Sequence, residues 1–242
     1  MNRKSIVSTI SAIALSLTIT PSALAKTAAL QKVQEVKQQS EQQVQQIDKQ
    51  ASKKVLMAKL ATLNFFSANF SQEVISDSGE LLDQSTGKLA ISKPNLANWQ
   101  TIEPNELSIV SDGNNVWFYD VWLEQVSVYS LSAAIAQTPI LLLTSQDESL
   151  WQQYNVTQHK EVFVVTAKNT DSQVQSLTLV FESNEGSIKG NVEQLSQFTF
   201  LDATGQKSNI KLSHYDAKNA PEAALFNFVI PNGVQVDDQR VN

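Results

Sequence analysis

The residue types that usually do chemistry are sparse in this chain, and their spacing does not match a catalytic or metal-binding motif. The two histidines, His159 and His214, belong to no metal-ligand motif. The chain has no cysteine, which excludes disulfides, thiolate metal sites and cysteine nucleophiles. We therefore predict no metal site and no cofactor, and we expect both histidines to be ordinary strand or loop residues.

Motifs for nucleophilic or nucleotide chemistry are also missing. The segment from Gly186 to Gly190 does not have the spacing of a nucleophile elbow, and Gly87-Lys88 lacks the other residues of a phosphate loop. Asp237 and Asp238 are adjacent carboxylates in a polar tail, where we expect them to be solvated. We predict that the protein is not an enzyme. Because carboxylates far apart in sequence can meet in space, a secreted enzyme is kept as one alternative.

After these exclusions, the remaining candidates for a functional site are apolar residues. The segment from Asn115 to Tyr119 reads as a strand after a turn at Ser111–Asn115, and it is apolar on both faces. An antiparallel strand with one solvated face alternates apolar and polar residues instead. A helix, a second sheet or an apolar ligand must therefore cover its second face.

Ten large apolar residues are candidates for a ligand cavity. They either form an ordinary core or line a cavity, and composition does not separate these two interpretations. The candidates are Phe66, Phe70, Val74, Leu89, Ile91, Trp99, Phe118, Ile140, Leu142 and Leu143.

The elements that must position these residues are mostly strands. Helical spacing predicts a helix over Val55–Phe70. Short apolar runs between turns predict strands from Ala68 to Tyr129 and again from Trp151 to Ile230, including Ser187–Gln194 and Phe226–Ile230. Leu131–Ala136 predicts a short helix, and Thr138 with Pro139 predicts the start of another. The fold class is mainly β, an incomplete antiparallel barrel with short helices against one face.

Residues 1–25 have the pattern of a secretory signal. Arg3 and Lys4 precede an apolar run, and Ala23-Leu24-Ala25 is a cleavage site. Cleavage after Ala25 changes the formal charge from −6 to −8 by removing the two basic residues. An acidic exported chain argues against nucleic acid and anionic membrane surfaces as partners.

Residues 26–54 differ from the rest, with nine glutamines and no aromatic residue. This leader is predicted to be either a solvated helix or flexible segment, or a coiled-coil contact. Residues 55–242 are predicted to be one folded domain.

Several segments in this domain resemble the periplasmic lipoprotein carrier proteins, the outer-membrane lipoprotein chaperones of Gram-negative bacteria. They keep the order and spacing of that family from about Val55 to Arg240. The matching pieces are Phe70-Ser71-Gln72, Lys93-Pro94-Asn95-Leu96, Trp99, Ser111-Asp112-Gly113, Trp117-Phe118-Tyr119-Asp120, Glu124-Gln125, Thr138-Pro139, Trp151 with Tyr154, and Asp237-Asp238-Gln239-Arg240.

The resemblance implies a half-open barrel closed by a helical lid that binds lipoprotein acyl chains. It implies a periplasmic monomer that takes lipoproteins from an inner-membrane ABC transporter complex and passes them to an outer-membrane receptor. The receptor of that pathway shares the fold but starts at a lipidated cysteine, which this chain lacks. The alternative is a half-barrel module that senses lipids or lipoproteins instead of carrying them.

Two positions depart from the pattern of the family. Lys93 stands where the family usually has an arginine that holds the lid closed, and an ammonium lacks the planar fork of a guanidinium. We therefore expect Lys93 to be a weaker lid latch. Ala97 stands where the family usually has an aromatic residue that contacts the transporter, which puts partner contact at that position in doubt.

Overall fold

The computed structural model describes residues 48–183 and 193–240, and the predicted signal and most of the predicted leader lie outside them. The described residues belong to one compact unit. Its chain enters as a helix that continues to residue 62, across the expected boundary at residue 54, and then turns into the first strand. In the described part of the chain, no helix is long and apolar enough to cross a membrane.

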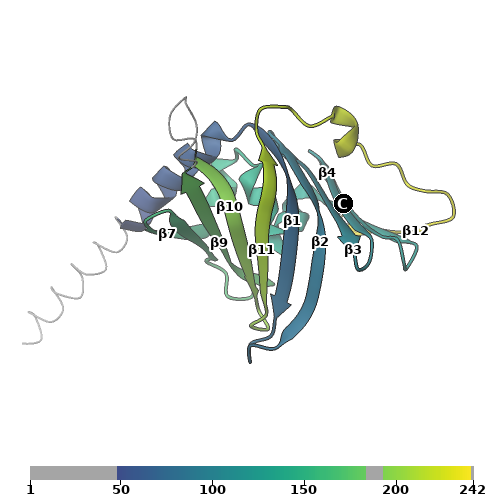
Figure 1. Cartoon of the computed structure of the whole chain (residues 1–242), viewed down its shortest axis with the longest axis horizontal. Coiled ribbons are helices and arrows are strands. Elements are labelled where there is room, and N and C mark those ends of the chain that lie inside the picture. Colours follow the sequence, from purple (N-terminus) through teal and green to yellow (C-terminus); the bar gives the residue numbers. More distant parts are fainter. Residues whose placement is uncertain (1–47, 184–192, 241–242) are drawn as a thin grey trace, which may run out of the picture. The chain divides into compact units, whose positions relative to one another are not determined.

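Within residues 48–183 and 193–240, twelve strands form a single unclosed sheet, which curves strongly in Figure 1. The order across the sheet is β12-β6-β5-β4-β3-β2-β1-β11-β10-β9-β8-β7. The bounds are β1 Phe65–Ile75, β2 Leu81–Ser92, β3 Leu96–Glu103, β4 Leu107–Asp112, β5 Asn115–Asp120, β6 Gln125–Ser130, β7 Tyr154–His159, β8 Val162–Ala167, β9 Val174–Ser183, β10 Glu193–Asp202, β11 Lys207–Asp216 and β12 Gln235–Asp238.

The prediction of a mainly β fold with an unclosed sheet and short helices is confirmed. Neighbouring strands pair antiparallel, as expected from short connections, with one difference. Strand β12 pairs parallel to β6, with Gln235 opposite Gln125, so the sheet is mixed. The final strand arrives through the long segment after β11, and this connection permits the parallel direction.

The alternation of residues along the strands gives the sheet an apolar inner face. Phe70 on β1 lies opposite Gly87 on β2 and Leu212 on β11, and Trp99 on β3 lies opposite Leu89 and Ile109. Buried side chains of this face form one core.

Three short elements between β6 and β7 cover the inner face, and we call residues 131–151 the lid. They are α2 Leu131–Gln137, the 3₁₀ helix η1 Pro139–Leu143 and α3 Glu148–Trp151. In Figure 1 they lie behind strands β9, β10 and β11. Pro139 stands in the first turn of η1, as predicted, although the Thr138 side chain makes no capping hydrogen bond.

The outer face is also apolar at β4, β5 and β6. Trp117 on β5 lies opposite Val110 and Val128, which are buried. Phe228 stacks on Trp117 with ring centroids 5.6 Å apart and contacts Tyr119 at 5.9 Å. The second apolar face of β5 is therefore covered by the chain's own C-terminal segment.

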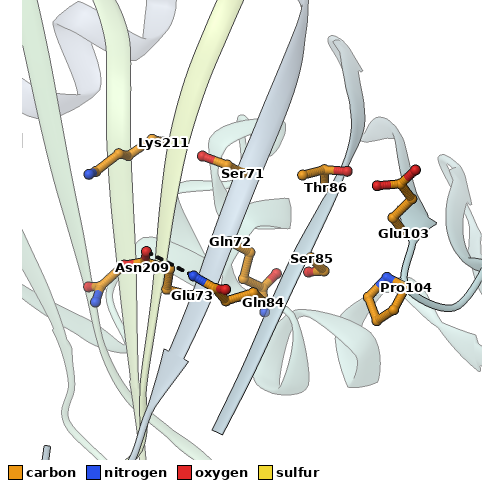
Figure 2. Close-up of a pocket in the computed structure, with 10 residues that line it drawn as sticks. All are labelled: Ser71, Gln72, Glu73, Gln84, Ser85, Thr86, Glu103, Pro104, Asn209 and Lys211. Carbon is orange, nitrogen blue, oxygen red and sulfur yellow. Dashed lines mark hydrogen bonds between the residues drawn. The ribbon is translucent and has the colours of Figure 1, made fainter. Parts of the chain in front are cut away.

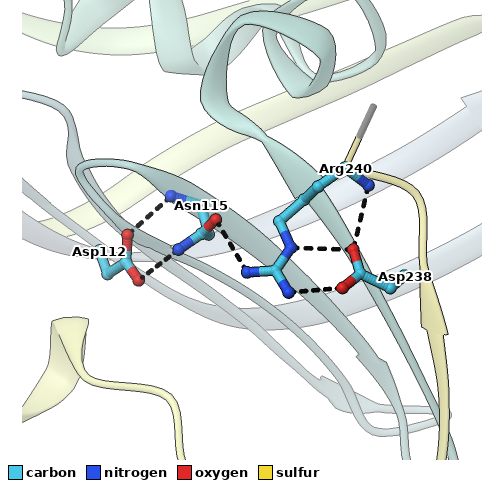
Figure 3. A network of polar contacts seen from close by, with 4 residues as sticks. All are labelled: Asp112, Asn115, Asp238 and Arg240. Atoms are coloured by element: carbon cyan, nitrogen blue, oxygen red, sulfur yellow. Dashed lines mark hydrogen bonds and ion pairs between the residues drawn. The ribbon is translucent and has the colours of Figure 1, made fainter. Parts of the chain in front are cut away.

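We call residues 217–240 the strap. It contains the 3₁₀ helix η2 Ala223–Phe226 and β12. Its last described residue, Arg240, donates from Nε to Asp238 Oδ1 at 2.8 Å and from Nη1 to Asn115 Oδ1 at 3.4 Å. Figure 3 shows this network beside Asp112, which accepts hydrogen bonds from Asn115.

Three element predictions were wrong. The helix expected over Val55–Phe70 ends at residue 62, because Phe66, Ala68 and Phe70 follow the two-residue period of β1. Phe226–Ile230 is not a strand, since Phe226 ends η2 and Phe228 packs on Trp117. Trp151 belongs to α3 instead of a strand, because Asp147 caps that helix by accepting from the Ser149 backbone at 2.8 Å. The strand expected over Ser187–Gln194 lies mostly outside the described residues.

Candidate functional site

A pocket of about 570 Å³ lies at one end of the inner face, between the sheet and the lid. Its apolar wall includes Trp99 and Ile109 from neighbouring strands, Phe200 from β10, and Ile140 from the lid. Its rim is polar, with the carboxylates of Asp83, Glu106, Asp120 and Asp202 among the lining residues. An apolar floor with a few polar groups at the mouth suits a ligand with an apolar body and a polar end.

Aromatic packing fixes the floor of this pocket. The rings of Phe70 and Trp99 lie 4.1 Å apart, and Phe198 meets Trp99 edge-on at 6.1 Å. Gly87 on β2 makes this packing possible, because a Cβ there would collide with the Phe70 ring and with the Gln100 carbonyl oxygen. The floor is therefore preformed by close contact between β1, β2, β3 and β10.

The structure brings most of the sequence-predicted residues together. Trp99, Phe118 and Ile140 line the pocket directly. Six of the other predicted residues lie deeper, in the core that continues from the pocket floor. Val74 is the exception, because it is half-buried on β1 outside that core. The deeper residues are Phe66, Phe70, Leu89, Ile91, Leu142 and Leu143.

Sequence reasoning missed the contribution of the second half of the sheet. Leu177 and Leu179 on β9 and Phe198 on β10 are fully buried in the same core, and Phe200 lines the pocket. Their two-residue spacing was the available signal. Tyr215 on β11 stacks on Phe66 with centroids 4.9 Å apart. Burial raises the pKa of Tyr215, and its buried hydroxyl has no partner in the described part of the chain.

The lid fills the inner face with its own apolar side chains. Ile140, Leu142 and Leu143 are each no more than 2% exposed. The helices that carry them are short, and neither α2 nor η1 has a side-chain cap. Short uncapped helices have little stability of their own. The lid therefore owes its position mainly to apolar burial.

The turn between β2 and β3 joins the lid to the N-terminal helix. The Asn95 backbone N–H donates to the Thr144 carbonyl at 3.2 Å, and the Lys93 backbone N–H donates to the Asn64 carbonyl at 2.8 Å. Lys93 Nζ donates to the Leu60 carbonyl at the end of the helix. Lys53, one turn earlier in that helix than Leu56, donates from Nζ to the Trp151 carbonyl of the lid at 2.7 Å.

The predicted latch requires Lys93 to contact the backbone of a helix. Lys93 does so, but its partner is the N-terminal helix and not a helix of the lid. Lys93 also lines a small pocket of about 210 Å³ with Leu60 and Trp151. Partial burial lowers the pKa of Lys93. Its role as a latch stays a prediction.

Ala97 is 4% exposed and lies on the inner face between Ile91 and Ser111. In this structure its side chain packs in the core, and its role in partner contact stays a prediction. Residues 48–183 and 193–240 contain no group of three His, Cys, Asp or Glu side chains placed to hold a metal ion.

A curved, unclosed sheet with an apolar pocket under a set of short helices defines a half-barrel binding protein. The floor is apolar and the polar groups stand at the rim, which is the arrangement expected for an amphipathic ligand.

Comparison with known proteins places the chain in one such family. A sequence profile described as "Outer membrane lipoprotein carrier protein LolA" matches residues 61–229. The outer-membrane lipoprotein carrier protein of Psychromonas ingrahamii is 42% identical over 187 residues, which cover 77% of this chain and 87% of that protein. The carrier protein of Photobacterium profundum is 38% identical over 76% of this chain and 88% of its own length. The chain belongs to the LolA family of outer-membrane lipoprotein carrier proteins.

Among solved structures, the LolA superfamily protein NE2245 from Nitrosomonas europaea is 14% identical with a TM-score of 0.46, over 73% of this chain and 98% of that chain. The fold described above follows from this chain's own strand pairing.

Proposed function

We propose that this chain carries lipoproteins by holding their acyl chains on the inner face of its sheet. Membership of the family makes it a periplasmic carrier of lipoproteins and not an enzyme. The observation that carries the proposed site is the pocket of about 570 Å³, which is apolar at its floor and closed on one side by Ile140. The inner-face residues named from the sequence are proposed to contact the acyl chains when the lid moves.

A carrier is needed because an acyl chain does not cross water unaided. Each CH₂ group removed from water contributes about 0.8 kcal/mol. An acyl chain with many CH₂ groups therefore strongly prefers an apolar environment. The inner face supplies that environment, and the strands that form it are tied together by continuous antiparallel pairing from β6 to β7.

Release requires that the same site does not bind too tightly. Leu142 and Leu143 occupy the inner face when the lid is closed, so they compete with the ligand for the same apolar surface. The net affinity is then the intrinsic affinity of the open state, reduced by the population of the closed state. We propose that transfer follows a difference in affinity between this protein and the next acceptor.

The flanking partners are proposed from the resemblance noted above. An inner-membrane ABC transporter complex would supply the lipoprotein, and an outer-membrane receptor would accept it. We propose that export uses the signal at residues 1–25 and that cleavage follows Ala25. The protein that works in the periplasm is then Lys26–Asn242, an acidic chain.

The experiment that tests this function is release of lipoprotein from spheroplasts. Purified Lys26–Asn242 is added to spheroplasts that make a labelled outer-membrane lipoprotein, and the supernatant is fractionated by size. A soluble one-to-one complex supports a carrier. No release by a protein shown to be folded by circular dichroism would favour the sensing module, in which lipoprotein binding is not followed by solubilisation.

A further inference from the structure

A second, polar pocket lies beside the apolar one. It has a volume of about 500 Å³ and spans strands β11, β1, β2 and the end of β3 (Figure 2). Alternation places most of its side chains on the outer face, opposite to Phe70 and Trp99. Amides, hydroxyls and a few charges line it, namely Ser71, Gln72, Glu73, Gln84, Ser85, Thr86, Glu103, Pro104, Asn209 and Lys211.

One strand edge borders this polar pocket. The pairing of β2 with β3 ends at Thr86 opposite Glu103, while β2 itself begins at Leu81. Within the described residues, the stretch 81–85 therefore has a strand partner on the β1 side only. An open edge presents backbone donors and acceptors to an added extended peptide.

The two pockets meet at this edge. Gln72, Ser85 and Pro104 line both the apolar pocket of the inner face and the polar pocket of the outer face. Strand β3 ends at Glu103, so a chain that leaves the apolar pocket here passes the end of β3 without crossing a strand. The polar pocket is thus continuous with the proposed acyl-chain site.

We propose that the polar pocket and the open edge of β2 bind the extended peptide that follows the acylated residue of a lipoprotein. This inference rests on the proposed function, because it needs acyl chains in the apolar pocket. Amides such as Gln84 and Asn209 and hydroxyls such as Thr86 match the donors and acceptors of a peptide backbone. The charged residues of the lining are Glu73, Glu103 and Lys211, so the site offers both carboxylates and an ammonium to a peptide. Gln84 Nε2 donates to Glu73 Oε1 at 3.3 Å, and Asn209 Oδ1 accepts from the Thr199 hydroxyl at 3.0 Å. A peptide backbone can bond the donors and acceptors that these contacts leave open, whereas an apolar chain cannot.

The absence of cysteine from the chain allows a direct test. Gln84→Cys places a thiol in the polar pocket, and Lys88→Cys places one on the same outer face of β2, two residue pairs beyond the pocket. The probe is a synthetic dipalmitoyl lipopeptide whose short Ser/Gly peptide carries one free cysteine a few residues after the lipid. Under mild oxidation, the probe is expected to form a disulfide with Gln84→Cys and much less with Lys88→Cys.

A second pair of variants measures affinity. Thr86→Trp fills the polar pocket from an exposed position, and Lys88→Trp is the matched control. Thr86→Trp is expected to weaken lipopeptide binding about fivefold and to change binding of dipalmitoylglycerol, which has no peptide, by less than about twofold. Lys88→Trp is expected to change neither affinity.

The outcomes separate this inference from the proposed function. If the lipopeptide fails to displace an apolar fluorescent probe from the unaltered protein, the acyl-chain site is wrong and this inference falls with it. If displacement occurs but Gln84→Cys and Lys88→Cys cross-link equally, or Thr86→Trp binds the lipopeptide normally, only the peptide site is overturned.

Discussion

The two apolar faces of the sheet are covered by segments of different construction. The inner face is covered by the lid, whose helices α2 and η1 have no side-chain caps. The outer face at β4–β6 is covered by the strap, which is joined to β6 by the parallel pairing of β12 and to β5 by Phe228 and Arg240.

The difference between the lid and the strap indicates which of the two moves when ligand binds. The strap combines backbone pairing, a stacked aromatic pair and a charged hydrogen bond, and each of these must break before the strap leaves. The lid is held by apolar burial of residues such as Leu142 and by single hydrogen bonds at Thr144 and Trp151. An incoming acyl chain offers apolar contact of the same kind in exchange for that burial. We therefore infer that ligand displaces the lid and leaves the strap in place.

The largest effect is expected from a polar side chain in the lid. Leu142→Gln puts an amide where the leucine is fully buried, and an unpaired amide costs about 1–3 kcal/mol in mutational data. We expect lipoprotein release from spheroplasts to fall about tenfold or more, because the substituted lid presents an amide to the acyl chains that it should cover.

Ser132→Gln is the matched control, since Ser132 is exposed on α2. Circular dichroism must show that both variants keep their sheet. Unchanged release by a folded Leu142→Gln protein would show that the lid does not contribute to lipoprotein binding.

The corresponding change under the strap should separate stability from binding. Trp117→Ala removes the stacking with Phe228 on the outer face. We expect a loss of about 2 kcal/mol in the free energy of unfolding, because Trp117 is only half-buried. Urea denaturation measures this loss. Affinity for an apolar fluorescent probe should stay within about twofold; a drop as large as that of Leu142→Gln would contradict the division between the two faces.

A smaller effect is expected at Lys93. Lys93→Arg offers the Leu60 carbonyl a guanidinium with several donors, so the lid and the N-terminal helix should hold the closed state more firmly. Binding of the apolar probe should weaken. Equal affinity of Lys93→Arg and the unaltered protein would show that Lys93 is not a latch.

Lys93 also predicts a pH dependence. Burial lowers its pKa from the ordinary value of 10.5, so the unfolded chain holds this proton at pH values where the folded chain has released it. Stability relative to Lys93→Arg should therefore rise as the pH rises from the lowered folded value to 10.5. Urea denaturation of both proteins over that range tests the sign, and a relative decrease would contradict it.

The smallest effect is expected at the end of the strap. Arg240 lowers the pKa of Asp238 from 3.8 to about 2 through its side-chain hydrogen bond. This contact is present above pH 3.8 and is lost as the pH falls through about 2. Arg240→Ala should increase hydrogen exchange in β12 at neutral pH without a measurable change in probe affinity, because exposed ion pairs contribute little. Equal exchange in the two proteins would show that the ion pair does not hold the strap.

The strands and the mainly β fold could be predicted from the sequence, but the assignment of residues to the two faces could not. Regular alternation and short turns give strands and a mainly β fold, and Pro139 marks the start of η1 because its ring suits a first turn. Phe66 misled the helix prediction, since it fits both the helical spacing from Leu56 and the strand spacing to Phe70. Local periodicity does not decide between the two.

The strap was not predictable from local pattern. Phe226, Phe228 and Ile230 alternate like a strand, but the docking of Phe228 on Trp117 joins positions far apart in sequence. The same limit applies to the partner of Lys93, because the Leu60 carbonyl belongs to another element. Long-range contacts of this kind depend on topology, which short motifs do not encode.

The most direct test of whether the lid moves and the strap stays is to fix each of them separately with an engineered disulfide. Asn95→Cys with Thr144→Cys would join the lid to the β2–β3 turn, where the two backbones hydrogen-bond at 3.2 Å. Gln125→Cys with Gln235→Cys would join the strap to β6 at a paired position. Since the chain has no other cysteine, each reduced protein is its own control. We predict that oxidation abolishes lipoprotein release only in the lid-pinned protein and that reduction restores it; normal release by the oxidised lid-pinned protein would contradict the account.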